Sequence, residues 1–214
     1  YVLYVYNKSG EVLWTKEVFG VPDWDSERRP SGVSYKRFIL VDDIDGDGIS
    51  EVLLSGQSRS RASYTDTLYC YNKAGTLRWK HGMGEKLQFR GKEFAEKGNW
   101  GVRDFFTVRV TKTAKPKLFV SAWVYPFTPS KLAEVDPVTS REVQTYWTFG
   151  GIDAILDFDV DNDGRREILI GGSNNSYNKA FLAVLDPTFI DGCTPATGEY
   201  VPVNYNRGTQ KYYL

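Results

Sequence analysis

Short apolar segments separated by turn-forming residues recur along this chain. The segment Leu3–Gly10 (LYVYNKSG) returns almost unchanged as Leu68–Gly75 (LYCYNKAG), and weaker copies begin at Leu132 and Leu182. Apolar residues on both sides of a tight turn predict a β-hairpin in each copy. A tryptophan follows most copies, and we expect these rings to pack between strands; they are Trp14, Trp79 and Trp147.

A second element lies between the hairpins. Residues 38–56 and 153–172 each contain an apolar strand-like run, a turn rich in Asp and Gly, and a second apolar run. The middle period, residues 104–122, keeps this outline, but its turn carries Lys112 and Lys115 in place of acids. Each period therefore predicts four short strands.

Four antiparallel strands per repeat are typical of a β-propeller blade. We therefore predict an all-β fold, a β-propeller built of four-stranded antiparallel blades, with about three and a half blades present. Closed propellers need roughly 4–8 blades, so we expect the chain to continue at both ends. Residues 85–97 contain helix formers interrupted by a glycine and are expected to form a loop with one helical turn. The predicted division of the single segment 1–214 is 1–19 (outer strands of a preceding blade), 36–81, 102–149 and 152–205 (blades), and 211–214 (start of the next blade).

Composition supports this class and narrows the chemistry. Aromatic residues make up 15% of the 214 residues, with 20 Gly and 9 Pro, as expected for strands joined by many turns. Balanced charge, 27 basic against 27 acidic residues, argues against a nucleic-acid partner, and no apolar run is long enough to span a membrane. The single histidine, His81, is expected to be a surface or structural residue. Cys70 is expected to be a buried thiol, and a disulfide to Cys193 is not expected.

The two acidic turns carry the strongest chemical signal. Both follow the pattern Asp-x-Asp-x-Asp-Gly-x-x-Glu, which gathers carboxylates on one tight turn. Ca²⁺ takes about 6–8 oxygen ligands in flexible geometry, whereas Mg²⁺ demands a stricter octahedron, so calcium is favoured. The alternative is that Asp and Gly serve only as turn formers. The predicted ligands are Asp43, Asp45, Asp47, Glu51 and the backbone carbonyl of Ile49, and Asp159, Asp161, Asp163, Glu167 and the backbone carbonyl of Arg165.

These turns are not EF-hands. The twelfth position of the loop, which carries a bidentate Glu in an EF-hand, is Leu54 in one copy and Ile170 in the other, inside a predicted strand. With the runs Val52–Gly56 and Ile168–Gly172 that follow them, the turns resemble the FG-GAP/VCBS repeats of integrin-α-type β-propellers. The resemblance implies a propeller fold and structural calcium. This chain departs from the family pattern because its middle repeat lacks the acids and because the fourth acid of each acidic turn is Glu.

Ligand binding is expected on the face opposite the acidic turns, where the longer loops lie. Long loops on a rigid scaffold often carry function, and aromatic rings beside Arg and Asn suit a sugar, a peptide or an acidic partner. The candidates are Trp24, Arg59, Arg61, Tyr64, Trp123, Tyr125, Asn174, Asn175 and Tyr177.

The sequence therefore predicts a calcium-stabilised binding or sensor module of a larger protein rather than an enzyme. Its partner would be a protein or glycan ligand, together with further blades or domains of the same chain. Two alternatives are a carbohydrate-binding, lectin-like propeller and a non-catalytic domain of a larger hydrolase or lyase. A calcium requirement favours an extracellular or cell-envelope location, with the cytoplasm as the alternative.

Overall fold

Strands form almost all of the regular structure. The computed structural model describes residues 2–17, 38–57, 64–84, 87–89, 92–94, 100–124, 129–203 and 207–214, with the backbone alone at 56–57, 64–66, 87–89 and 92–94. Within these ranges the only helical element is a single 3-10 turn, η2 (Gly198–Tyr200). The predicted all-β class is therefore confirmed.

An antiparallel hairpin opens the chain and a four-stranded antiparallel sheet follows it. The hairpin pairs β1 (Val2–Tyr6) with β2 (Val12–Glu17). The sheet, here called the first sheet, has the order β3-β4-β5-β6. Its strands are β3 (Ile39–Asp42), β4 (Glu51–Gln57), β5 (Tyr64–Tyr71) and β6 (Leu77–Gly82).

Two further sheets repeat this plan. The second sheet contains β9 (Trp100–Val108), β10 (Lys117–Val124), β11 (Ser130–Val135) and β12 (Glu142–Thr148), with β16 (Gly192–Cys193) added in parallel beside β12. The third sheet contains β13 (Ile152–Phe158), β14 (Glu167–Asn174), β15 (Lys179–Leu185) and β17 (Tyr212–Tyr213).

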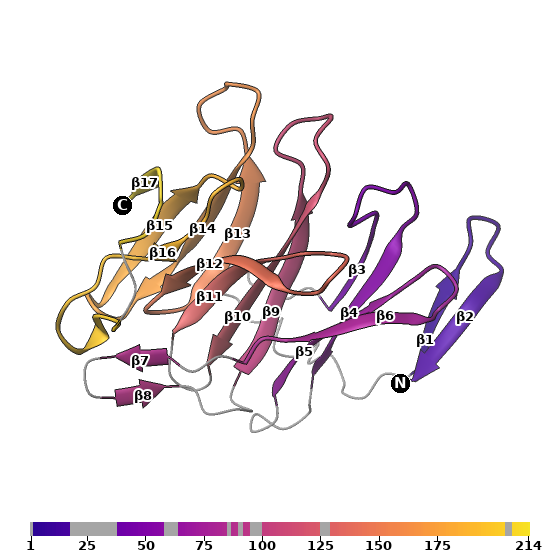
Figure 1. The fold of residues 1–214 in the computed structure, drawn as a ribbon, viewed down its shortest axis with the longest axis horizontal. Helices are drawn as coiled ribbons and strands as arrows, with labels where there is room; N and C mark the ends of the chain where they lie inside the picture. Colours follow the sequence, from indigo (N-terminus) through magenta and orange to yellow (C-terminus); the bar gives the residue numbers. More distant parts are fainter. Residues whose placement is uncertain are drawn as a thin grey trace, which may run out of the picture.

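The hairpin and the three sheets lie side by side in sequence order (Figure 1). In the part of the chain that the structure describes, they form an open row and not a closed ring. In each sheet the first three strands are neighbours in chain order, as predicted for a propeller blade. The fourth strand follows directly in the first and second sheets, whereas in the third sheet it is β17, which comes after β16 in the chain. The loops that join the first two strands of each sheet project from the same edge of the row (Figure 1).

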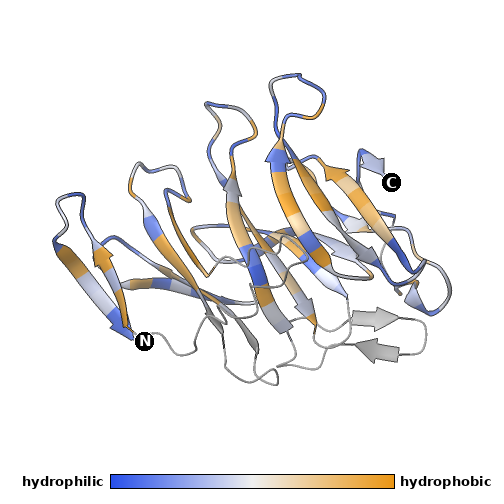
Figure 2. Ribbon diagram, turned by 180° about the vertical axis from the view of Figure 1, so that it is seen from behind, coloured by the Kyte–Doolittle hydropathy of each residue, from blue (hydrophilic) through white to orange (hydrophobic). Residues whose placement is uncertain are grey.

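Apolar side chains fill the three interfaces between neighbouring sheets. Side chains that alternate along a strand point to opposite faces of its sheet. In strand β4, Val52 and Leu54 face the hairpin while Leu53 faces the second sheet. The second sheet is covered on both faces, so its strands β10 and β11 are buried at nearly every position. Figure 2 shows hydrophobic residues concentrated on the strands and hydrophilic residues in the projecting loops.

Side-chain hydrogen bonds join each sheet to the backbone of the next. The indole N–H of Trp14 donates to the Lys73 carbonyl at 3.1 Å, and that of Trp79 donates to the Pro137 carbonyl at 2.7 Å. In the second sheet the equivalent position is Gln144, whose Oε1 accepts from the Ile190 N–H at 2.8 Å. We call these contacts the inter-sheet latches.

Trp147 is not the third member of that series. In the turn after β11, the Asp136 N–H donates a hydrogen bond to the Arg141 carbonyl. This turn is one residue longer than the turns at Asn7 and Asn72, so the residue that pairs at the position of Trp14 and Trp79 is Gln144. Trp147 instead lies in the core, 1% exposed, with its ring 5.8 Å from that of Trp100. The expected packing role is confirmed for all three tryptophans, but the expected equivalence of Trp147 is wrong.

Two other expectations need correction. Residues 211–214 do not begin another sheet, because β17 pairs with β15 and completes the third sheet. Residues 87–89 and 92–94 form a short antiparallel pair, β7 (Leu87–Phe89) and β8 (Lys92–Phe94), where a loop with a helical turn was expected. Cys70 is a buried thiol, as expected; Cys193, in β16, is a second buried thiol, and no disulfide joins the two.

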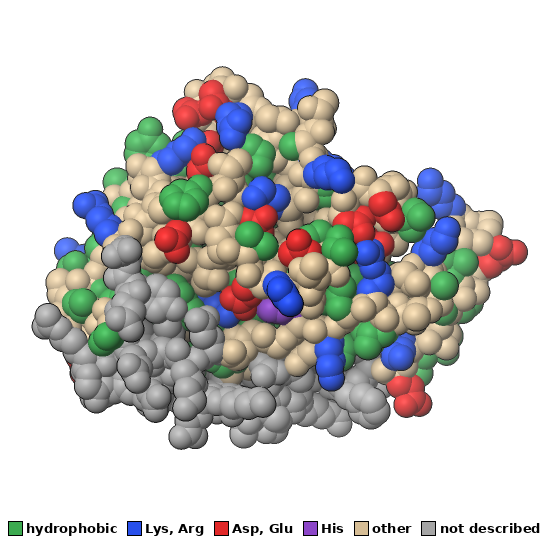
Figure 3. All heavy atoms as spheres, viewed as in Figure 1, with side chains coloured by type: hydrophobic (Ala, Val, Ile, Leu, Met, Phe, Trp, Pro, Cys, Tyr) green, Lys and Arg blue, Asp and Glu red, His purple; other side chains and the backbone are tan. Residues whose placement is uncertain are grey.

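The surface carries both charge signs intermingled, as Figure 3 shows for one face. This distribution agrees with the balanced composition and gives no single-sign field on that face. Among the described residues, no helix has the length and apolar character needed to cross a membrane.

Candidate metal centres

The first acidic turn connects β3 to β4 and is shaped by its own carboxylates. Asp43 Oδ1 accepts hydrogen bonds from the backbone N–H groups of Gly46 and Asp47 at 2.7 and 3.0 Å, and its Oδ2 accepts from Gly48 at 3.1 Å. Gly46 and Gly48 have φ angles of 77° and 86°, a region that glycine adopts at little cost. This tight turn brings Glu51, the first residue of β4, close to Asp43.

The second acidic turn, between β13 and β14, repeats this arrangement. Asp159 Oδ1 accepts from the Asp163 N–H at 3.1 Å, and its Oδ2 accepts from Gly164 at 3.0 Å. Asn162 takes the place of Gly46 with a φ of 59°, and Asn is one of the few residues that tolerate this conformation. Two turns with different intervening residues therefore fold in the same way.

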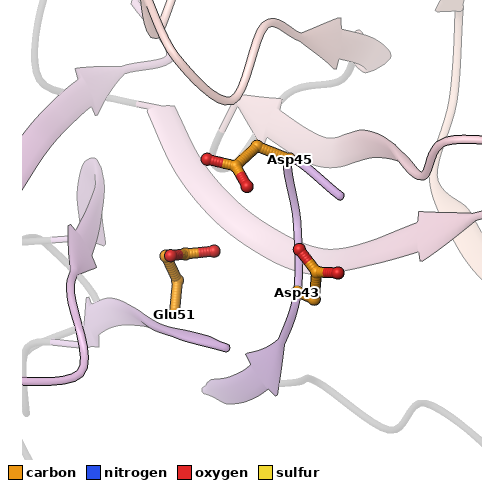
Figure 4. Close-up of side chains that lie close together, drawn as sticks. All are labelled: Asp43, Asp45 and Glu51. Carbon is orange, nitrogen blue, oxygen red and sulfur yellow. The ribbon is translucent and has the colours of Figure 1, made fainter. Parts of the chain in front are cut away.

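Each turn gathers three carboxyl groups. The first acidic site consists of Asp43, Asp45 and Glu51, and the second of Asp159, Asp161 and Glu167; in each, one oxygen per residue lies within 4.8 Å of the others. Figure 4 shows the carboxyl groups of the first site around a common space. Two ligands of one Ca²⁺ lie at most about 5 Å apart, twice a typical Ca–O distance of about 2.4 Å. The donor set and its spacing therefore fit a calcium ion.

The glutamate in each site is buried. Glu51 and Glu167 are both only 2% exposed. Each accepts a backbone hydrogen bond across the turn, Glu51 from Ile44 at 3.4 Å and Glu167 from Val160 at 3.0 Å. Burial raises the pKa of Glu51, and the bond from Ile44 opposes this rise. A buried carboxylate needs a positive partner to keep its charge, and both sites contain one.

A basic side chain from the fourth strand of the sheet contacts each site. Arg78 on β6 reaches Asp45 Oδ2 and Glu51 Oε1, both at 2.8 Å. Lys211, just before β17, lies 2.7 Å from Glu167 Oε1 and 3.9 Å from Asp161 Oδ2. The hydrogen bonds to Asp45 and Glu167 raise the pKa of Arg78 and Lys211, respectively.

Two of the predicted carboxylate ligands lie outside these clusters. Asp47 Oδ1 accepts from the Ile49 N–H, and Asp163 Oδ1 accepts from the Arg165 N–H, each at 2.7 Å. These carboxylates therefore close the turn locally. The two acidic sites are defined by side-chain oxygens alone. The backbone carbonyls of Ile49 and Arg165 therefore stay predicted ligands.

The second sheet has a connection of the same length, residues 109–116, which carries neither the acids nor the positive φ angles of the acidic turns. Strand pairing places Lys117 where the other sheets have Glu51 and Glu167, since all three open the second strand opposite the last residue of the first. The Lys117 Nζ lies 2.9 Å from Glu134. A lysine therefore occupies the place that a buried glutamate of an acidic site takes in the neighbouring sheets.

The predicted ligand-binding residues lie at the opposite ends of the strands where the structure describes them. Trp123 near the end of β10 stacks with Arg103, whose guanidinium carbon is 4.6 Å from the ring centroid. Asn174 is only 1% exposed, and its amide donates to the Pro195 carbonyl and the Tyr213 hydroxyl, so it is a structural residue.

Tyr177 is 43% exposed in the turn after β14, and the backbone N–H of Asn175 donates to the Phe149 carbonyl at 2.8 Å. The rest of this predicted set is not described: Trp24, Arg59, Arg61 and Tyr125 lie outside the described residues, and of Tyr64 only the backbone is given.

Sequence reasoning missed Arg78 and Lys211. Arg78 directly precedes Trp79, a residue of the repeated hairpin, so the sequence could have indicated a basic side chain at this place in the sheet. Lys211 had no such signal, because a long connection separates it from β15.

Comparisons with known proteins give no family. No protein-family model matches the chain, and no curated protein matches it. Among solved structures, the crystal structure of the exotype rhamnogalacturonan lyase YesX is similar at 15% sequence identity, with a TM-score of 0.46. The match covers 85% of this chain and 34% of the other, so the chain spans about a third of the length of that protein. A likeness at this level carries no argument about function.

Proposed function

We propose that this chain is a segment of a calcium-stabilised β-propeller that serves as a binding or sensor module of a larger protein. The observation that supports it best is the pair of acidic sites at matching positions of two sheets. The resemblance of both turns to FG-GAP/VCBS repeats points in the same direction. Four strands paired antiparallel in each sheet, in chain order apart from the step from β15 to β17, and sheets that pack face to face in sequence order support blades of a propeller.

The role proposed for calcium is structural. Asp43, Asp45 and Glu51, and in the second site Asp159, Asp161 and Glu167, would hold the ion, with Asp47, Asp163 and the carbonyls of Ile49 and Arg165 as further candidates. A bound cation would offset the repulsion among acids that the fold places within 4.8 Å of one another. It would thereby fix the connection between the first two strands of its sheet.

Recognition would take place at the opposite ends of the strands. Trp123 offers an aromatic surface there, beside Arg103, which also lies 3.6 Å from Asp153. An aromatic ring flanked by charged groups suits sugars as well as peptides, so the second candidate is a carbohydrate-binding, lectin-like propeller. A glycan-binding screen of the chain, compared with a Trp123→Ala variant, separates a glycan ligand from a protein ligand. A non-catalytic domain of a larger hydrolase or lyase is the third candidate.

Thermal unfolding in excess Ca²⁺, in excess chelator and in excess Mg²⁺ tests the proposal. Two sites each saturated about 100-fold would add roughly 5 kcal/mol. At about 2–4 °C per kcal/mol for a chain of this size, the midpoint would rise by roughly 10 °C or more in Ca²⁺. Mg²⁺ would produce a much smaller rise.

Variants of the two sites provide the control. Asp45→Asn and Asp161→Asn each remove one carboxylate, so each should lower the calcium-dependent rise while leaving the other site intact. Asp191→Asn changes an exposed acid far from both turns in sequence and should keep the full rise. A midpoint that is the same in Ca²⁺ and chelator would show that the acids serve only as turn formers.

A further inference from the structure

Arg78 and Lys211 occupy equivalent places in their sheets. Cys70 pairs with Leu53 and Val184 pairs with Leu169, which are matching residues of the two acidic repeats. Across the next strand pair, Cys70 faces Trp79 and Val184 faces Tyr212. Arg78 and Lys211 are the residues directly before those partners. Two sequence segments with no visible similarity therefore present a basic side chain at the same register position.

Both basic residues contact the same pair of acids in their own site. Arg78 bridges Asp45 and Glu51, and Lys211 lies against Glu167 and Asp161. In each case these are the second aspartate and the glutamate of the turn. The side chains of Arg78 and Lys211 are 26% and 31% exposed, whereas those of Glu51 and Glu167 are 3% and 2% exposed. The basic groups thus reach inward from the surface onto buried carboxylates.

The second sheet supplies an internal comparison. There the register position of Arg78 and Lys211 is Val143, the residue skipped by the bulge between Glu134 and Val135. The same sheet has lost the acids and carries Lys117 at the glutamate position. Acids and the basic residue are therefore present together in two sheets and absent together in the third.

We propose that Arg78 and Lys211 are displaceable internal cations that compete with Ca²⁺ for the acidic sites. This inference rests on the proposed function. Without metal, each basic group neutralises the second aspartate and the glutamate and holds the fourth strand onto the turn. A calcium ion needs the same oxygens, so the guanidinium or ammonium group gives them up and turns toward solvent. The pair of basic residues thereby sets the calcium concentration at which each site fills.

The first site contains more positive charge than the second. In addition to Arg78, Arg109 of the second sheet lies 3.8 Å from Asp43 Oδ2. The second site faces Lys211 alone among the ion pairs of the described residues, and its Asp161 side chain is 44% exposed. The competition is therefore stronger at the first site, and Arg78 is the more informative residue to change.

Isothermal titration of the chain with CaCl₂ tests the inference. Arg78→Gln and Lys211→Gln remove the competing charge but keep a polar side chain. Each variant should bind Ca²⁺ at its site roughly tenfold more tightly, because a charge-assisted hydrogen bond changes an equilibrium constant by about that factor. In chelator the same variants should unfold at lower temperature than the wild type. Lys80→Gln on β6 and Lys179→Gln on β15 are matched controls and should change neither quantity.

The outcomes separate the inference from the function on which it rests. Unchanged or weaker calcium binding by both variants, with a wild type that binds, overturns the competition and leaves the calcium function standing. Binding by the variants but not by the wild type supports the competition and overturns calcium stabilisation of the wild type. Binding by none of these proteins overturns both. If one variant does not fold, the other variant still gives the comparison.

Discussion

Lys131 and Glu142 form an ion pair that is separate from the acidic sites. The Lys131 side chain is 1% exposed, lies 2.6 Å from Glu142 Oε1, and has the rings of Trp100 and Trp147 at 5.3 and 5.5 Å. His81 of the first sheet approaches the same carboxylate oxygen at 3.2 Å. A single glutamate thus joins two sheets through two basic partners. The expected structural role of His81 agrees with this contact.

Replacing Lys131 should be costly. Lys131→Met keeps most of the side-chain length but leaves Glu142 without its closest positive partner, and removing one member of a buried pair costs about 3 kcal/mol. Urea unfolding at neutral pH measures this loss. The double variant Lys131→Met/Glu142→Gln should regain part of it, because no uncompensated charge remains. A double variant less stable than Lys131→Met would contradict this account.

The same pair predicts a pH dependence. Burial acts to raise the pKa of Glu142, but the hydrogen bond from His81 and the charge of Lys131 outweigh it, so the net pKa lies below 4.5. A carboxyl group with a depressed folded-state pKa stabilises the protein above its unfolded pKa and loses this contribution as the pH falls through the folded value. Glu142→Gln should therefore reduce the loss of stability seen below pH 4.5 in urea titrations. An unchanged acid limb of the stability profile would refute the assignment.

At the scale of elements, the inter-sheet latches at Trp79 and Trp14 are expected to contribute unequally to the free energy of unfolding. Trp79→Phe removes the indole donor and leaves the partly buried Pro137 carbonyl without it, which costs about 1–3 kcal/mol. Trp14→Phe makes the same change at an exposed contact, where water can replace the indole, and should cost less. Chemical unfolding of the two variants makes the comparison. Equal losses would mean that ring size, and not the hydrogen bond, sets the cost.

The elements also show which parts of the fold the sequence could predict. Hairpins and acidic turns were predictable because their signals are local: Gly and Asn at left-handed positions, Asp beside Gly, and alternation along each strand. The equivalence of Gln144 with Trp14 and Trp79 was not, because one added turn residue moves the register without changing the apolar pattern. Strand β17 was misassigned because its partner β15 is reached only after a long irregular connection.

The acidic sites show the same division between local and distant signals. Asp43, Asp45 and Glu51 lie on one turn, so their clustering follows from spacing alone. Arg78 joins them from a strand two positions away in the sheet, and only the pairing of β4, β5 and β6 brings it there. The diversion of Asp47 and Asp163 into local turn bonds could not be predicted either, because the sequence pattern treats all three aspartates alike.

At the scale of the whole molecule, the reactivity of the two buried cysteines can be used to follow the opening of two different sheets. Burial raises the pKa of Cys70 to about 12 and that of Cys193 to about 11, so each thiol reacts only when its surroundings open. Cys70 belongs to the first sheet, which carries an acidic site, whereas Cys193 lies in β16 of the second sheet, where the glutamate position is a lysine.

Calcium should therefore protect Cys70 more than Cys193. Pulsed thiol labelling in mild urea, read by peptide mass spectrometry with and without Ca²⁺, measures both sites in one sample. Glu51→Gln should weaken the calcium-dependent protection of Cys70. Equal protection of both thiols would mean that the sheets open as one cooperative unit.

The inter-sheet latches have a consequence for how such a chain can change by duplication. All three contacts reach backbone groups of the neighbouring sheet, namely the carbonyls of Lys73 and Pro137 and the N–H of Ile190. A backbone partner places no demand on the identity of the side chain at that position. A whole repeat can therefore be copied, lost or exchanged at these boundaries while each remaining latch still meets a partner. Individual repeats are then free to gain or lose an acidic turn, as the second sheet illustrates.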